Sequence, residues 1–274
     1  MHRVALGGIE LTVLDDGVFS FPAKPFFRNV PESEWHDEVG ADAEGRIRVG
    51  HNCGLVDLGG ELIVVDTGYG DDTHGGAAGH LLEELDRAGR KREDVTLVVN
   101  THAHGDHVKR NTIVEDGRRR PTFPRARYHL GVADRQWFAG RRGLVHEFDE
   151  QIGSIEALGQ LALVDGEHAL TPEALIHPTP GHTPGHASLI VESQGQTAIF
   201  LGDLCHHPLH FSHPDWVSEF DTDPEVTPRT RAMLFELAVE RDALLVCAHA
   251  APPGLGRLER ANGGFVWEPV EIGV

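Results

Sequence analysis

The heptapeptide THAHGDH at residues 101–107 is the most informative stretch of this sequence. It directly follows residues 95–100, a short and almost wholly apolar run that predicts a strand covered on both faces. In extended backbone, alternate side chains project to the same side, so His102 and His104 can reach one common point. A turn at Gly105 then lets the next aspartate and histidine face a second point nearby. Three imidazoles and a carboxylate at such spacing suit zinc or a similar divalent metal.

Further metal donors are expected elsewhere, because one loop cannot complete the coordination of two metals. His182 lies in TPGHTPGH at residues 179–186, where two prolines and two glycines fix an irregular turn. Asp203 and His249 each follow a predicted strand. Loops at the strand ends of one sheet edge converge, and α/β proteins usually build their sites there. The sequence therefore predicts that these distant donors meet the histidine cluster.

The remaining patterns alternate strands and helices, without a repeat or a Pro-rich or Gly/Ser-rich linker. Strands are expected in two groups: 10–14, 51–58, 61–65 and 95–100 first, then 161–164, 174–177, 187–192, 197–201 and 243–247. Helices are expected over 80–88 and 228–241, where apolar residues recur at helical spacing, and the second is expected to turn Met233, Leu234, Leu237 and Ala238 inward. This order predicts a layered α/β protein with one domain over residues 1–274. The basic, aromatic stretch at about 110–149 is interpreted either as a lid insertion over the site or as a surface excursion.

Composition excludes several classes of partner. The chain has 274 residues, 40% hydrophobic and 24% charged, which is ordinary for a globular protein. Its net charge of −19 argues against nucleic acid and against an anionic membrane surface. No stretch approaches the roughly 20 apolar residues of a membrane span. Three scattered cysteines and an N-terminus that turns acidic early lead us to expect a reduced, cytoplasmic protein.

The order of the donors resembles the HxHxDH…H…D…H pattern of the metallo-β-lactamase superfamily: His102, His104, Asp106, His107, His182, Asp203 and His249. The Asp66-Thr67-Gly68 turn matches an early element of the same superfamily. The resemblance covers nearly the whole chain and implies an α/β fold, a four-layer αββα metallo-β-lactamase-like sandwich. It also implies two divalent cations along one edge, with zinc expected and manganese, cobalt or iron as alternatives.

The resemblance divides the donors into two sets that Asp203 bridges: His102, His104 and His182 for one cation, and Asp106, His107 and His249 for the other. Two cations that share a water can turn it into a bridging hydroxide, which attacks a carbonyl or phosphoryl centre. Asp106 is the expected acceptor of the proton that this hydroxide releases.

Within the superfamily the chain looks most like the lactonase and organophosphate-hydrolase branch, through ELTVLDDGVFSFPAKPFF, RPTFPRARYHL, TPGHTPGH and GDLCHH. Lactonases of that branch typically carry a tyrosine three residues after the bridging aspartate, and this chain has His206 there. The expected activity is hydrolysis of lactones or related carboxylic esters, with His206 as a catalytic residue. The alternatives are a phosphotriesterase, which His206 favours, and an oxidoreductase resembling mononuclear iron persulfide dioxygenases.

Residues that support the metal ligands or line the substrate pocket can also be proposed. A metal-bound histidine normally donates its other N–H to a carboxylate or carbonyl, and we expect Asp66 and His186 in such supporting positions. Apolar walls of the substrate pocket are expected from Phe26, Phe27, Trp216 and Phe220, although these aromatic residues fit an ordinary core equally well, and His207 is a further candidate for the pocket. The expected partner is a small-molecule substrate, and relatives of this branch are often homodimers.

Overall fold

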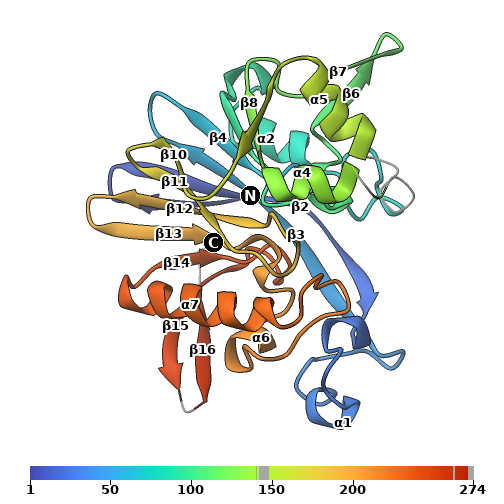
Figure 1. Ribbon diagram of the computed structural model, residues 1–274, viewed down its shortest axis with the longest axis vertical. Helices are drawn as coiled ribbons and strands as arrows, with labels where there is room; N and C mark the ends of the chain where they lie inside the picture. Colours follow the sequence, from blue (N-terminus) through green and yellow to red (C-terminus); the bar gives the residue numbers. More distant parts are fainter. Residues whose placement is uncertain (140, 142–147, 262, 271–274) are drawn as a thin grey trace.

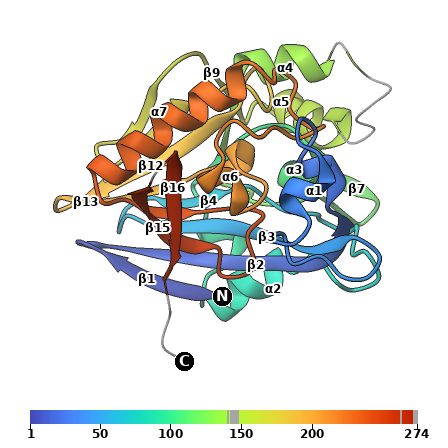
Figure 2. The ribbon, with the colours of Figure 1, turned by 90° about the horizontal axis from the view of Figure 1, so that it is seen from below.

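The computed structural model describes residues 1–139, 141, 148–261 and 263–270. Two seven-stranded sheets stack face to face, and helices cover their outer faces (Figure 1). Seen from below, α7 and α2 lie on opposite sides of the stacked sheets (Figure 2). The predicted four-layer αββα arrangement is therefore confirmed.

The first sheet contains the N-terminal strands and orders them as in the chain: β1 (His2–Leu6), β2 (Ile9–Pro22), β3 (Arg46–Asp57), β4 (Leu62–Val65), β5 (Leu97–Val99), β8 (Arg127–Gly131) and β9 (Leu161–Val164). Strands β1 to β4 pair antiparallel, and β4, β5, β8 and β9 pair parallel. A parallel arrangement brings the carboxyl ends of β4 and β5 to one edge of the sheet.

The strands of the second sheet also lie in the order in which they occur in the chain: β10 (His168–Thr171), β11 (Ala174–Pro178), β12 (Ala187–Ser193), β13 (Gln196–Phe200), β14 (Leu244–Val246), β15 (Leu255–Ala261) and β16 (Gly264–Pro269). Only β13 and β14 pair in parallel, and the loops that follow them leave the sheet at the same edge. Strands β6 (Thr112–Glu115) and β7 (Arg118–Pro121) form a separate hairpin.

The helices are α1 (Glu32–Trp35), α2 (Leu81–Arg87), α3 (Gly105–Val108), α4 (Val132–Ala139), α5 (Ser154–Ala157), α6 (Leu209–Ser212) and α7 (Val226–Glu240). Short helical turns add η1 (Lys24–Phe26), η2 (Arg92–Asp94), η3 (Asp149–Gly153) and η4 (Gly202–Leu204). Among the described residues no helix is both long and apolar enough to span a bilayer.

Apolar residues at alternate strand positions build the core between the sheets. Val65 and Val99 of the first sheet lie in one buried cluster with Leu189 and Val246 of the second. A further cluster joins the second sheet to α7 through Leu234 and related residues. Burying apolar area in this way contributes about 25 cal/mol per Å² and is the main force that holds the layers together.

One predicted helix face is wrong in part. The helical spacing in α7 turns Leu234 and Ala238 inward, as expected, but Met233 is 65% exposed and Leu237 is only half-buried. The layer below α7 is a single sheet, so one stripe of the helix is covered and the neighbouring stripe faces solvent.

Part of the stretch 110–149 belongs to the first sheet in the described residues. Strand β8 lies between β5 and β9, which makes it an interior strand of the first sheet. Tyr128 and His129 are neighbours on this strand and so point to opposite faces, and both are buried, as an interior parallel strand requires. The expected lid also includes residues 140 and 142–147, which lie outside the described residues.

Candidate metal centre

All seven predicted donors come from loops at one edge of the two sheets. The first four follow β5, and Asp106 and His107 lie in the first turn of α3. His182 lies in the loop between β11 and β12, and Asp203 lies in η4 after β13. His249 follows β14. The structure brings all of them together, although the first and last donors lie 147 positions apart in the chain.

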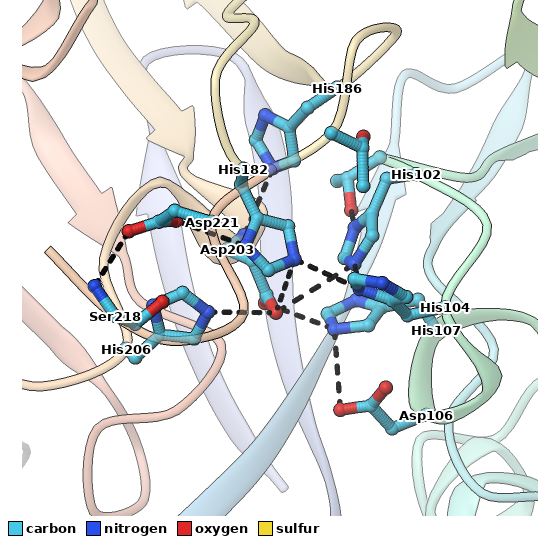
Figure 3. Close-up of polar contacts among 12 residues, drawn as sticks. His102, His104, Asp106, His107, His182, His186, Asp203, His206, Ser218 and Asp221 are labelled. Atoms are coloured by element: carbon cyan, nitrogen blue, oxygen red, sulfur yellow. Dashed lines mark hydrogen bonds and ion pairs between the residues drawn. The ribbon is translucent and has the colours of Figure 1, made fainter. Parts of the chain in front are cut away.

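The first donor set consists of three imidazoles and one carboxylate. Nδ1 of His104 lies 2.9 Å from Nε2 of His102 and 2.9 Å from Nε2 of His182. Oδ2 of Asp203 lies 3.7 Å from the His102 nitrogen and 3.4 Å from the His182 nitrogen. Figure 3 shows the three rings converging beside the Asp203 carboxylate. Four ligand atoms so close together can surround a single cation.

The second donor set shares that carboxylate. Oδ1 of Asp203 lies 3.0 Å from Nε2 of His107 and 2.9 Å from Nε2 of His249. Oδ2 of Asp106 lies 3.6 Å and 3.7 Å from the same two nitrogens. Each oxygen of Asp203 therefore faces a different set, which is the arrangement of a ligand that bridges two metals.

The chemistry of these atoms fits divalent cations. Nε2 of His107 and Oδ1 of Asp203 are buried and have no well-formed hydrogen bond within the described residues. Burial, together with the nearby imidazoles, holds the pKa of His102 well below its usual range and lowers that of His104 to about 3. Both rings are therefore neutral, and a metal needs the lone pair of a neutral imidazole.

Buried negative charge favours a cation at the second set as well. Burial alone would lower the pKa of His107, but the carboxylates of Asp203 and Asp106 outweigh it and raise that pKa well above the usual value. A centre that attracts a proton so strongly attracts a divalent cation for the same reason, and the cation displaces the proton.

Asp66 supports the second set, as the sequence suggested. Its Oδ2 accepts a 2.8 Å hydrogen bond from Nδ1 of His107. The same carboxylate accepts the backbone N–H of Thr101 at 2.7 Å and the Thr101 hydroxyl at 2.8 Å. Asp66 thus fixes both the ring of His107 and the start of the histidine loop. His249 is fixed in a similar way, because its Nδ1 donates to the carbonyl oxygen of Gly50 at 2.9 Å.

His186 acts on the backbone of Asp203 rather than on an imidazole. Its Nε2 accepts the N–H of Asp203 at 3.0 Å, and its Nδ1 donates to the carbonyl oxygen of Thr179 at 3.0 Å. The ring therefore links the β11–β12 loop to η4. It holds the bridging carboxylate in register with the loop that carries His182.

Asp134 on α4 is a supporting residue that sequence reasoning missed. Its carboxylate accepts the N–H of Ala103 at 3.1 Å, the hydroxyl of Thr183 at 2.9 Å and the N–H of Gly185 at 2.6 Å. One buried side chain thus joins the two donor loops through their backbones. No sequence signal marks it, because an aspartate near a helix start is ordinarily a solvated residue.

A cavity of about 290 Å³ opens directly onto both donor sets. Its apolar wall is formed largely by aromatic side chains: Phe19, Phe21, Phe26, Val49, Tyr69 and Phe220. The alternating Phe-Ser-Phe at residues 19–21 was an overlooked signal, because alternate residues of a strand share one face. His51 also borders the cavity, and its Nδ1 lies 3.9 Å from Oδ2 of Asp106.

Three of the five predicted pocket residues do not line this cavity. Phe26 and Phe220 border it, whereas Phe27, His207 and Trp216 lie behind Phe26 in an aromatic cluster. The ring of Phe27 lies 5.6 Å from that of His207 and 5.8 Å from that of Trp216. The short η1 turn points consecutive phenylalanines in different directions, so only one of the pair reaches the cavity.

His206 lies at the border of the first donor set. Its Nε2 is 3.4 Å from Oδ2 of Asp203, and neither ring nitrogen has a well-formed hydrogen bond within the described part of the chain. The ring borders the cavity between Phe26 and Phe220. Burial lowers the pKa of His206, which keeps the imidazole neutral. A neutral ring at this place offers one donor and one acceptor to a molecule in the cavity.

The profile of the Metallo-beta-lactamase superfamily matches residues 46–249 of this chain, and the chain belongs to that superfamily. A probable metallo-hydrolase of Mycobacterium tuberculosis is 24% identical over 251 residues, which cover 75% of this chain and 76% of the relative. Because the chain belongs to this superfamily and brings these metal donors together, the protein is a metal-dependent hydrolase.

Two solved structures have nearly the same fold over their whole length. The hydrolase AbOPH of the beta lactamase superfamily superposes with a TM-score of 0.88 at 25% identity and covers 100% of this chain and 98% of its own. AidC, a dizinc quorum-quenching lactonase, gives a TM-score of 0.84 at 24% identity, again over 100% of this chain and 98% of its own. The predicted resemblance to this superfamily is thereby confirmed.

Proposed function

We propose that this protein is a dinuclear hydrolase that opens lactones or cleaves related carboxylic esters. The observation that carries the proposal is the shared carboxylate of Asp203, which places two complete donor sets at the floor of one aromatic cavity. The dizinc lactonase AidC, whose fold this chain shares, supports the choice of reaction.

Two divalent cations, with zinc the metal we expect, would activate a water as nucleophile and polarise the electrophilic oxygen of the substrate. His102, His104 and His182 would hold one of them, and the other donor set would hold the second, with Asp203 between them. Asp66 and Asp134 fix the loops that carry these donors, so the site needs little rearrangement when it binds.

The cavity wall positions the substrate. Phe26 and Phe220, whose ring centroids lie 5.6 Å apart, hold an apolar acyl or aryl group and exclude water from the reacting centre. Oδ2 of Asp106 lies at the cavity floor and accepts the proton that the attacking water releases. His206 donates a ring N–H to the developing negative charge on the substrate oxygen, where a lactonase of this branch has a tyrosine hydroxyl.

Phosphotriester hydrolysis is the second candidate. The observation that favours it is His206 itself, which replaces the hydroxyl that lactone opening uses in the lactonase pattern. The phenylalanine side chains of the wall also fit an aryl leaving group. A mononuclear iron oxidoreductase is disfavoured, because a single iron in the first donor set would leave Asp106, His107 and His249 without a metal to bind.

A substrate panel on protein of measured metal content tests the proposal. Lactone opening is followed with a pH indicator, and aryl esters and aryl phosphotriesters are followed through the absorbance of the released phenol. We expect the zinc-loaded protein to open lactones fastest, with Asp203→Asn inactive and Asp215→Asn, at an exposed position, fully active. Protein with two cations per chain that turns over none of the three classes would refute the proposal.

A further inference from the structure

His182 is held from behind by a carboxylate that the sequence did not single out. Nδ1 of its ring lies 3.2 Å from Oδ1 of Asp221, while Nε2 faces the first donor set. Figure 3 shows Asp221 on the side of His182 that faces away from His104. Asp221 and His182 are both buried, so solvent cannot replace this contact.

Asp221 is itself fixed from two sides. Its Oδ2 accepts the backbone N–H of Ser218 at 2.8 Å and lies 3.9 Å from the guanidinium of Arg231. Arg231 on α7 is fully buried and donates to the carbonyl oxygens of Leu204 and Trp216.

The backbone of the same segment is fastened to the loop that carries the histidine. The N–H of Thr222 donates to the carbonyl oxygen of His182 at 2.9 Å, and the N–H of Asp223 donates to that of Gly181 at 2.8 Å. Side-chain and backbone contacts therefore act together. The ring of His182 therefore cannot turn without losing its contact with Asp221, and its loop cannot shift without breaking these two backbone hydrogen bonds.

We propose that Asp221 is a positioning residue that strengthens metal binding at the first donor set, as Asp66 does at the second. The carboxylate accepts the N–H at Nδ1 of His182, so the lone pair on Nε2 points to the cation. Such an outer contact typically contributes 10–100-fold to metal affinity. This inference rests on the proposed dinuclear site. It adds that two separate carboxylates set the affinities of the two halves of that site.

Metal titration in a one-site background tests the proposal without measuring turnover. His249→Ala removes a donor from the second set and leaves the first set complete. Metal-free full-length protein with this substitution is titrated with Co²⁺, whose visible absorption reports its coordination, against a chelator of known affinity. Asp221→Asn is then added, and Asp215→Asn, at an exposed position, serves as the matched control.

We expect Asp221→Asn to weaken Co²⁺ binding about 10–100-fold in this background, and Asp215→Asn to change it less than about threefold. Asp221→Glu keeps the carboxylate but displaces it, so it should bind Co²⁺ more tightly than Asp221→Asn and more weakly than the His249→Ala background, and it carries the test if the asparagine variant does not fold. Unchanged affinity in the Asp221 variants, or an equal loss in Asp215→Asn, would overturn the proposal. Failure of the proposed hydrolysis would leave these affinities as predicted, so the two failures can be told apart.

Discussion

Gly202→Ala should damage both stability and metal binding, because this glycine sits immediately before the bridging aspartate. Gly202 has φ of +56°, where an L residue costs roughly 1–2 kcal/mol. A Cβ atom at this position would lie 2.6 Å from Nε2 of His186 and 2.8 Å from Cβ of Thr101. Such overpacking typically costs about 1–3 kcal/mol more.

The total expected loss is about 2–5 kcal/mol in the free energy of unfolding, or roughly 5–15 °C in Tm for a chain of this size. The displaced ring of His186 would also lose the 3.0 Å hydrogen bond from the N–H of Asp203. Because Asp203 faces both donor sets, we expect metal binding at both sites to weaken in the same variant.

Gly159→Ala is the matched control. Gly159 has φ of +72°, but a Cβ there would meet nothing within 4 Å. This variant should lose only the roughly 1–2 kcal/mol of backbone strain and bind metal normally. Thermal unfolding of both metal-free variants, followed by metal titration, separates strain from the clash. Equal losses of Tm in the two variants, with normal metal uptake in Gly202→Ala, would refute the role assigned to His186 and η4.

His206→Tyr restores the hydroxyl of the lactonase pattern and should raise the ratio of kcat/KM for lactones over phosphotriesters about tenfold, the value of one hydrogen bond of about 1.4 kcal/mol. A ratio that stays constant would count against a role for this position in specificity. Phe220→Ala should raise KM for phenyl substrates more than for methyl esters, while Tm changes little because Phe220 is already 37% exposed. Equal changes in both KM values would remove Phe220 from the substrate wall. Burial lowers the pKa of His129 from 6.5 to about 4, so its neutral form stabilises the fold above pH 6.5 and this stability is lost as the pH falls towards 4. Relative to His129→Leu, the wild type should lose about 3 kcal/mol between pH 7 and pH 4 in urea unfolding, and parallel pH profiles would contradict this.

The donor set could be predicted because each donor lies in a loop directly beside a strand with a clear pattern. His182, Asp203 and His249 are far apart in the chain, but a sheet edge gathers the loops that follow its strands. Strand β9 was predicted at Leu161–Val164, and the structure has the same bounds. Local pattern and topology were sufficient for these features.

The cavity wall could not be predicted from local pattern alone. The alternation at residues 10–14 predicted a short strand, whereas β2 continues to Pro22 after an irregularity in its register between Asp15 and Gly17. This extension carries Phe19 and Phe21 to the cavity. Which of several aromatic residues faces a cavity depends on how distant elements pack, as the different positions of Phe26 and Phe27 show.

The supporting carboxylates were hidden for a related reason. Asp66 lay in a recognisable turn, so its role could be suggested. Asp134 and Asp221 act through contacts with residues 31 to 51 positions away in the chain. Their effect comes from burial and from the backbone groups they meet. Neither property is encoded in the residues on either side of them.

The metal content of active protein tests the central claim most directly. Protein purified and loaded with zinc should contain two cations per chain and open lactones, while Asp203→Ala should lose both high-affinity binding and turnover. The decisive measurement is metal per chain by elemental analysis, made on the same samples as the lactone assay. A single bound ion per chain in fully active protein, or an Asp203→Ala variant with wild-type metal content and turnover, would contradict a hydrolytic centre built on a shared carboxylate.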